Sequence, residues 1–363
     1  MTVTHTGPGL TITEMVVPAH LDDADAADFH ALVALNNAVC LADTGLDDLS
    51  RTAAEMLPEW QDRTDHVTRT FLAHEGRALV GAVTVGHGVA EPTSAEVDLM
   101  VLPEHWGRGV EQALLDRAEA EVRALGRRVM QAWTLHRAAA GTAPLVPKTG
   151  WGAISSTPHA RLLAENGFAL EQVERNSAFD LQADPAPVER MLAEALAVAG
   201  DDYRVVSWTV PTPPELRAGY AWALSRMSTD VPSGDLEIDE ETWDAERIAR
   251  RDARFVDGGQ TVSVAAVEHV PTGTIAAFNE LVTGSAPGEV THQYCTLVLK
   301  EHRGHRLGIV VKCANILRWR GIAPQSPRIT TFNAEENRPM LDINEALGFA
   351  PASYAGAWQK RLA

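Results

Sequence analysis

The sequence is short of cysteine, of long apolar runs and of positive charge, and each shortage excludes a class of protein. Three cysteines occur in 363 residues, Cys40, Cys295 and Cys313, and none of them forms a CxxC pair. This number and spacing argue against a disulfide-rich secreted domain and against a zinc site, and they predict a reducing, cytoplasmic compartment. No apolar run reaches the roughly 18 residues of a membrane span, and the N-terminus lacks the basic and apolar segments of a secretory signal.

Positive charge is also scarce, because 31 lysines and arginines stand against 49 aspartates and glutamates, for a net charge of −18. Nucleic acid is therefore excluded as the main partner, since binding to phosphates needs a basic surface. The charge suits a cationic small molecule drawn in by the field of the protein, although an acidic surface also simply keeps a protein in solution. The length allows two domains of ordinary size.

One segment reverses this charge. Residues 294–299 are an apolar, β-branched run typical of a strand, and apolar residues continue at helical spacing over 307–319. The turn between them carries five basic or near-basic side chains: Lys300, His302, Arg303, His305 and Arg306. A strand that leads through a glycine-containing turn into a helix presents free N–H groups and the positive end of the helix dipole, which bind a diphosphate. A solvated basic turn is the alternative interpretation.

The run Arg303-Gly304-His305-Arg306-Leu307-Gly308 resembles the Arg/Gln-x-x-Gly-x-Gly/Ala acyl-CoA loop of the GNAT superfamily of N-acetyltransferases. The segments NAEEN at 333–337 and NEALGF at 344–349 resemble the closing segment of that family. Arg306 stands where the family usually has its middle glycine, and its guanidinium is suited to grip a phosphate.

The same unit occurs twice, because VLPEHWGRGVEQALL at 101–115 parallels VLKEHRGHRLGIVVK at 298–312. The resemblance implies an α+β fold with a mixed sheet, in two tandem GNAT-like domains arranged as in mycothiol synthase. We expect an N-terminal domain over 1–182, a helical connector over 183–202 and a C-terminal domain over 203–363. In the first copy Trp106 replaces the arginine of the loop and Glu111 replaces its last glycine, so acyl-CoA is predicted in the second copy. Apolar periodicity predicts helices over 19–42, 46–60, 112–125, 188–199, 215–227 and 237–254.

The resemblance also implies site residues. Acetyl-CoA is expected to contact ten residues of the C-terminal domain: Leu297, Val298, Arg303, Gly304, His305, Arg306, Leu307, Gly308, Asn333 and Asn337. Glu280 is the predicted base, with His292 assisting through a water, and Tyr354 is a candidate proton donor; a surface role is the alternative for Glu280 and His292. The tyrosine that the family uses as general acid is absent, since Leu163 and Asn344 stand at the two corresponding positions.

These features predict an acetyl-CoA-dependent N-acetyltransferase that transfers directly to an amine of a small, cationic metabolite or antibiotic, as a monomer or homodimer. The missing tyrosine keeps open a non-catalytic acyl-CoA-binding or sensor protein of the same fold. Activity in the first domain is a third interpretation.

Overall fold

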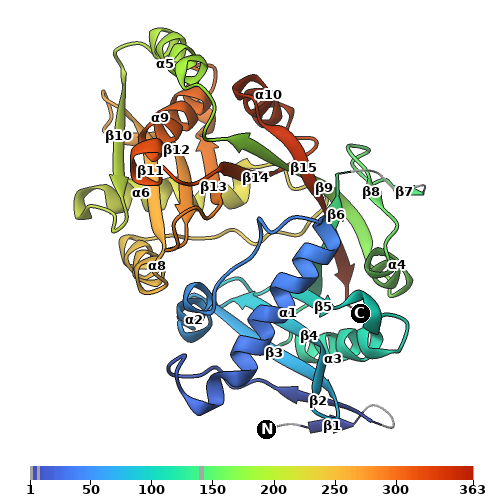
Figure 1. Ribbon diagram of the computed structural model, residues 1–363. Coiled ribbons are helices and arrows are strands. Elements are labelled where there is room, and N and C mark those ends of the chain that lie inside the picture. Colours follow the sequence, from blue (N-terminus) through green and yellow to red (C-terminus); the bar gives the residue numbers. More distant parts are fainter. Residues whose placement is uncertain (1–2, 6–8, 139–142, 363) are drawn as a thin grey trace. The chain divides into compact units, whose positions relative to one another are not determined.

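The computed structural model describes residues 3–5, 9–138 and 143–362, which form two compact units (Figure 1). Unit 1 contains Met1–Glu174, Ser233–Asp239 and Ser353–Ala363, and unit 2 contains Arg175–Pro232 and Glu240–Ala352. Each unit is a sheet covered by helices, in agreement with the α+β fold class. The domain boundaries predicted at residues 182 and 203 divide the chain between its two sequence repeats. These boundaries stay a prediction.

Unit 1 is built on a mixed sheet whose strands lie in the order β1-β2-β3-β4-β5-β6-β15. The strands are β1 (Val3–His5), β2 (Leu10–Glu14), β3 (His66–Glu75), β4 (Ala78–Gly88), β5 (Ser94–Val101), β6 (Val129–Arg137) and the part of β15 (Ala350–Arg361) from Ser353 on. Strands β5 and β6 are parallel, whereas the other pairs are antiparallel. The short strands β7 (Pro144–Leu145) and β8 (Ile154–Ser155) pair separately.

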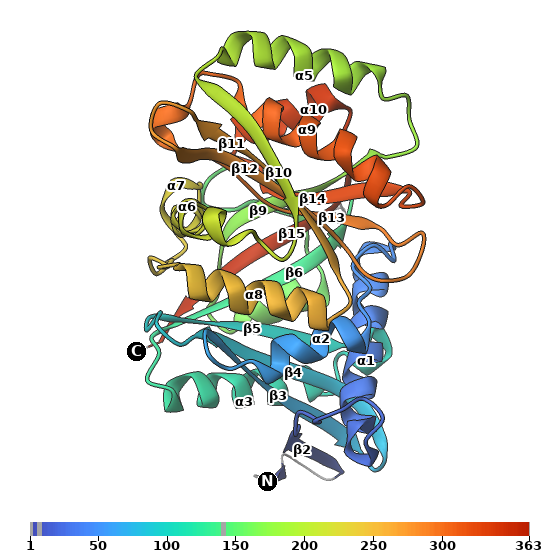
Figure 2. The same ribbon diagram turned by 90° about the vertical axis from the view of Figure 1, so that its left-hand side faces the viewer.

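Helices cover both faces of this sheet, because neighbouring strand residues point to opposite sides. Phe71 packs in the core that includes α3 (Val110–Ala124), whereas Leu72 packs in the core formed with α1 (Ala27–Thr44) and α2 (Ala53–Gln61). Figure 2 shows α1 and α3 with the strands between them. Helix α4 (Pro158–Glu165) joins the α3 side.

Unit 2 repeats this plan with the strand order β14-β13-β12-β11-β10. The strands are β10 (Tyr203–Thr209), β11 (Thr261–His269), β12 (Thr274–Thr283), β13 (Thr291–Val298) and β14 (Arg328–Ala334). One face packs against α6 (Pro214–Ser225) and α8 (Ala245–Asp257), next to the short α7 (Met227–Asp230). The other packs against α5 (Ala186–Ala199), α9 (Leu307–Ile322) and α10 (Arg338–Leu347).

Two strands belong to both units. Strand β9 (Ala169–Asp180) passes from unit 1 to unit 2 after Glu174. Strand β15 starts in unit 2 and enters unit 1, where Ser353 to Arg361 pair antiparallel with Arg137 to Val129 of β6. The sequence predicted a last strand in this region but not its partner.

The helix predicted over 237–254 was too long at its start. It begins at Ala245 because the side chain of Asp244 accepts a hydrogen bond from the N–H of Arg247 and caps it. Residues 237–244 form neither helix nor strand, and in unit 1 the N–H of Glu237 donates to the side chain of Gln359. The helix predicted over 46–60 likewise begins only at Ala53, after a capping box.

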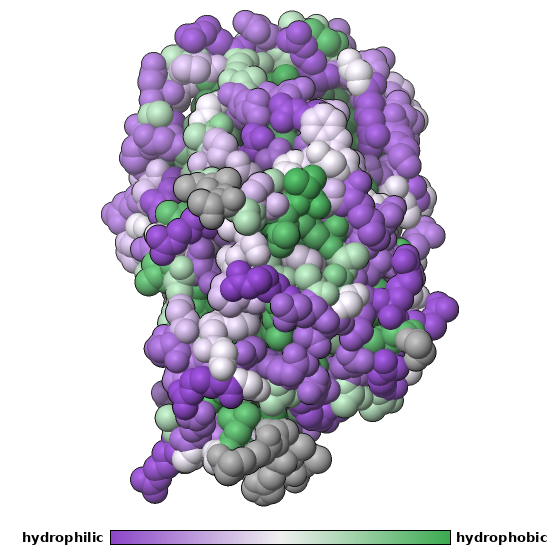
Figure 3. All heavy atoms as spheres, turned by 90° about the vertical axis from the view of Figure 1, so that its right-hand side faces the viewer, coloured by the Kyte–Doolittle hydropathy of each residue, from purple (hydrophilic) through white to green (hydrophobic). Residues whose placement is uncertain are grey.

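On the face drawn in Figure 3, apolar side chains form patches separated by hydrophilic ones, as a net charge of −18 leads one to expect. Among the described residues, no helix combines the length and apolar character that crossing a bilayer requires.

Candidate active site

The parallel strands of unit 1 separate part-way along their length. Pairing runs from Ser94 opposite Val129 to Val97 opposite Ala132. Beyond this point β5 continues to Val101 and β6 to Arg137 with no further pairing between them in the described residues. The separation leaves an open wedge, with unpaired backbone groups along both of its sides.

A cavity of about 350 Å³ lies beside this wedge, and we call it the acidic cavity. Its described lining includes four carboxylates and two tryptophans but no lysine or arginine. The lining residues are Asn36, Val39, Cys40, Asp43, Glu59, Trp60, His66, Thr68, Thr84, Gly86, Glu96, Val97, Asp98, Leu99, Met100, Trp133, Leu135 and His159. Aromatic walls around several carboxylates are suited to bind a cation, although Glu59 is already bridged to Arg51 at 3.0 Å.

Two of the carboxylates are poised for proton transfer near neutral pH. Desolvation by the surrounding cavity walls raises the pKa of Asp98 to about 6, although the residue is exposed to the open cavity. Burial and the nearby charge of Asp98 raise the pKa of Asp43 to about 6 as well, against the opposing effect of Arg137. Asp98 remains accessible from the cavity. A carboxylate with such a pKa is a stronger base than an ordinary surface aspartate, as general base catalysis requires.

The turn before α3 has the backbone of an anion-binding nest. Gly107 and Gly109 have φ of 78° and 84°, and a Cβ added at either would meet nothing within 4 Å. The chain itself fills part of this nest, because the buried Glu111 accepts a 2.9 Å hydrogen bond from the N–H of Gly107 through Oε1. Glu111, which the sequence placed beside the expected phosphate site, thus contacts this turn, and its effect on acyl-CoA binding stays a prediction.

In unit 2, the corresponding space holds a buried ion pair. Glu280 of β12 is fully buried and bridged to Arg251 of α8, with Oε1 2.6 Å and Oε2 2.9 Å from the guanidinium nitrogens. The hydroxyl of Tyr220 also donates to Glu280, and so does the N–H of Cys295, at 3.3 Å. Cys295 stands at the position that Asp98 holds in the first copy.

This environment does not suit the role of base predicted for Glu280. Burial alone opposes ionisation, but the Arg251 guanidinium and the hydrogen bonds outweigh it and lower the pKa of Glu280. A carboxylate held as a stable anion by a partner in direct contact is a weak proton acceptor. The same contacts occupy the side of the strands on which unit 1 has its cavity.

The turn before α9 has the backbone expected of an acyl-CoA loop. Gly304 has φ 91°, and Arg306, the N-cap residue of α9, has φ 55°, the one positive value of a non-glycine residue in the described chain. A Cβ at Gly308 would lie 3.1 Å from Ile343 Cδ1, which explains the glycine there, and Leu307 is buried in the core.

The other side chains of this turn already have partners. Arg303 donates to the carbonyls of Val298, at 3.2 Å, and Asp230, at 3.1 Å. The ring of His305 packs against Tyr203, with 5.1 Å between centroids. The expected phosphate contacts of Arg303 and His305 thus require rearrangement of these side chains.

The strand edge predicted to hold the pantetheine arm is also present in unit 2. Leu297 and Val298 pair with Phe278 and Ala277 of β12, and a register irregularity of the β12–β13 pair lies between Asn279 and Leu281. On its other side, β13 pairs with β14 only at Thr291 and His292 among the described residues. Next to Leu297 and Val298, β13 therefore has no strand partner on that side, although the carbonyl of Val298 accepts from Arg303.

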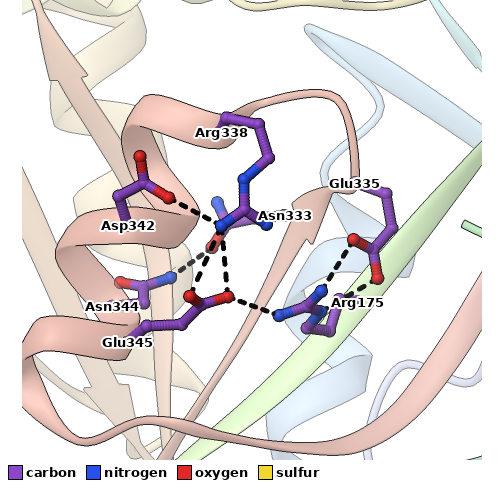
Figure 4. A network of polar contacts seen from close by, with 7 residues as sticks. All are labelled: Arg175, Asn333, Glu335, Arg338, Asp342, Asn344 and Glu345. Atoms are coloured by element: carbon purple, nitrogen blue, oxygen red, sulfur yellow. Dashed lines mark hydrogen bonds and ion pairs between the residues drawn. The ribbon is translucent and has the colours of Figure 1, made fainter. Parts of the chain in front are cut away.

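The two asparagines expected to contact the cofactor lie at the end of β14 and the start of α10 (Figure 4 shows Asn333). Asn333 accepts a 2.7 Å hydrogen bond from Asn344, which in turn accepts one of 2.6 Å from the buried Lys312. Asn337 is the N-cap residue of α10 and makes no side-chain cap. Asn344, at the family's tyrosine position, is thus a structural residue with 1% exposure.

A charged network surrounds this point in Figure 4. Arg175 binds Glu335 through two hydrogen bonds, of 2.9 and 2.8 Å, and also reaches Glu345, which shares Arg338 with Asp342. These pairs hold α10 against β9 and leave little unpaired charge for a ligand.

The remaining predicted catalytic residues belong to different units. His292 lies at the start of β13, with its Nδ1 3.2 Å from the hydroxyl of Thr330. Tyr354 belongs to unit 1, where it lies opposite His136 in the β15–β6 pair. No unit contains Glu280, His292 and Tyr354 together.

Sequence reasoning missed Asp43 and Asp98. The sequence did contain one signal for this site: Asp98 is the only acidic residue in the apolar strand 97–102, and it aligns with Cys295 of the second copy. Because polar and apolar residues alternate in a strand with one face in solvent, Asp98 looked like an ordinary solvent-facing residue.

Residues 41–143, the part of the chain that holds the acidic cavity's strands and the α3 turn, match the model of the acetyltransferase (GNAT) family. Residues 41–143 therefore have the sequence signature of the GNAT acetyltransferase family. A search of the curated proteins found no match.

Several solved structures share its fold. A tandem GNAT protein from the clavulanic acid biosynthesis pathway has 23% identity and a TM-score of 0.70, over 96% of this chain and 98% of the other. A GCN5-related N-acetyltransferase from Sphaerobacter thermophilus has 15% identity and a TM-score of 0.59, over 96% and 95%. A glucosamine N-acetyltransferase region of a fungal multi-domain β-N-acetylglucosaminidase has 14% identity and a TM-score of 0.57, over 96% of this chain and 38% of the other. These likenesses confirm the tandem GNAT fold of the whole chain.

Proposed function

We propose that this GNAT protein is an acetyl-CoA-dependent N-acetyltransferase that acts on a small cationic amine bound in the acidic cavity of unit 1. The observation that carries the proposal is the contrast between the units. Unit 1 has an open cavity with carboxylates of raised pKa, whereas unit 2 has a neutralised ion pair at the corresponding strands. The sequence had favoured unit 2, so this placement revises the predicted catalytic residues.

The residues of unit 1 are compatible with acyl-CoA. The N–H groups that begin α3 have no partners within the helix, and the open glycines of the turn leave room for a diphosphate. The unpaired edges of β5 and β6 offer hydrogen bonds to the amides of the pantetheine arm. When bound, acetyl-CoA would supply an acetyl group activated as a thioester.

The chain's own residues would perform three tasks. The acidic cavity binds and orients the ammonium group of the acceptor, with Trp60 and Trp133 against its apolar part. Asp98, with a pKa of about 6, takes the proton that must leave before the nitrogen can attack. Asp43 raises the local negative charge and thereby holds the acceptor near Asp98.

Paired variants test this location. Asp98→Asn should lower kcat/KM for thiol release with a panel of amines by about 10²- to 10³-fold. Gly308→Glu, which places a carboxylate and a clashing Cβ in the unit 2 loop, should leave turnover unchanged. The reverse result would return transfer to unit 2, together with Arg303, Arg306 and the other residues of its loop.

Non-catalytic binding of acyl-CoA is the second candidate function. Leu163 and Asn344, at the two tyrosine positions, are each 1% exposed, and neither is a proton donor of the required kind. Tight binding of acetyl-CoA in titration calorimetry, without thiol release across the amine panel, would favour this function.

A further inference from the structure

A buried histidine nitrogen in unit 1 has no partner. His159 is the second residue of α4 and is 8% exposed, and its Nε2 finds no hydrogen bond among the described residues. Buried polar atoms in folded proteins nearly always have a partner. An unpartnered one in the wall of a cavity therefore points to a ligand that completes it.

The position of His159 indicates which part of a ligand it would meet. Its ring packs on Trp106 of the turn before α3, with 5.6 Å between centroids and 39° between planes. Trp106 is itself fixed by a 2.8 Å hydrogen bond from its Nε1 to the carbonyl of Val101. His159 also lines the acidic cavity. It thus lies between the diphosphate nest and the acceptor, where the thioester end of the cofactor must pass.

The imidazole is neutral at physiological pH. Burial, with a smaller contribution from nearby His136, lowers the pKa of His159 to about 4. A neutral imidazole keeps one N–H and can stabilise developing negative charge by donating a hydrogen bond without giving up its proton.

We infer, on the basis of the function proposed for unit 1, that His159 donates a hydrogen bond from Nε2 to the sulfur of the bound thioester and stabilises the departing thiolate. The amine nitrogen forms a bond to the carbonyl carbon, the carbon–sulfur bond breaks, and its electron pair stays on sulfur. Asp98, after passing the ammonium proton to solvent, takes the second proton that the nitrogen loses on attack; the imidazole proton stays on His159, and the thiolate takes a proton from solvent on release. Leu163, at the family's tyrosine position, is apolar and cannot donate.

The pKa of the thiol in bound coenzyme A tests this role without turnover. It can be followed by thiolate absorbance during a pH titration of the saturated complex. In the unmodified protein the thiol pKa should fall by about one unit relative to the free thiol. His159→Gln, which keeps an N–H at similar reach, should retain most of this fall. His159→Phe, which keeps the ring packing on Trp106, should abolish it.

Kinetics supply the second arm. His159→Phe should lower kcat with acetyl-CoA by about tenfold or more with little change in KM, and the Gln variant should recover part of the loss. An unchanged thiol pKa in the Phe variant, or a Gln variant no better than Phe, overturns the assignment. If Phe prevents folding, His159→Met, also without an N–H, replaces it. If Asp98→Asn stops turnover but the His159 variants do not behave as expected, only the role of His159 is wrong. If Asp98→Asn has no effect on turnover, the function proposed for unit 1 is wrong.

Discussion

The N–H of Gly107 donates to the carboxylate of Glu111 at 2.9 Å, so unit 1 places its own negative charge in the nest that would receive a diphosphate. The other carboxylate oxygen of Glu111 is buried without a partner in the described residues. A ligand diphosphate and this carboxylate would compete for the same N–H and would repel each other.

Replacing Glu111 with Gln should therefore tighten the binding of acetyl-CoA to unit 1. The gain should be about tenfold in Kd, because a charge at the first turn of a helix is worth about 1 kcal/mol. Titration calorimetry in the Gly308→Glu background reports unit 1 alone. Glu104→Gln, exposed in the same turn, is the matched control and should change nothing. Weaker binding by Glu111→Gln would mean that the carboxylate supports the nest.

Asp98 should make stability depend on pH in a definite direction. Its pKa of about 6 in the folded protein exceeds the roughly 3.9 of an unfolded chain, so its contribution to the free energy of unfolding falls as pH rises from about 4 to about 6. Asp98→Asn should raise the free energy of unfolding by about 1 kcal/mol at pH 7.5, a figure reduced for solvent screening, and should give no gain at pH 4. Urea unfolding at the two pH values measures this. Asp116→Asn, at an exposed residue, is the control and should change the free energy of unfolding equally at both pH values. A gain in stability of Asp98→Asn at pH 4 would contradict the raised pKa of Asp98.

The Arg251–Glu280 pair should behave as a structural element of unit 2. Arg251→Met leaves the buried Glu280 charge uncompensated and should cost about 3–5 kcal/mol of stability. The double variant Arg251→Met with Glu280→Gln should recover much of that loss in thermal unfolding. Turnover per folded molecule should be unchanged in both. A selective loss of kcat in the double variant would instead restore Glu280 as a catalytic candidate.

Arg306 adopts a left-handed conformation, with φ 55°, that glycine tolerates better. Arg306→Gly should therefore raise stability by up to about 1 kcal/mol. The neighbouring His305→Gly removes the contact with Tyr203 without relieving strain and should lower it. If the Arg306 guanidinium binds a phosphate in unit 2, the Gly variant will also bind coenzyme A more weakly. Titration calorimetry with coenzyme A, in protein that keeps Glu111, measures this loss of affinity separately from the change in stability. A destabilised Arg306→Gly protein would show that the side chain has a packing role.

Local features of the molecule could be predicted, and long-range ones could not. The strand–turn–helix units ending in α3 and α9, and the left-handed backbone at Gly304, follow from residues adjacent in sequence. Asp43 and Asp98 approach each other only because β5 and β6 separate beside α1, and no local pattern encodes that event. Arg251 looked like part of a solvated charged helix, since its partner Glu280 lies on a strand 29 residues later.

The strand β15 has a consequence for how the protein is made. Trp358 of this strand is 2% exposed within the core of unit 1, its indole donates to Thr134, and Lys360 binds Glu119. These residues are synthesised more than 200 residues after their partners, Thr134 and Glu119. The edge of β6 must therefore stay unpaired until β15 has been synthesised, and a nascent chain cut short before residue 353 would expose that edge to aggregation.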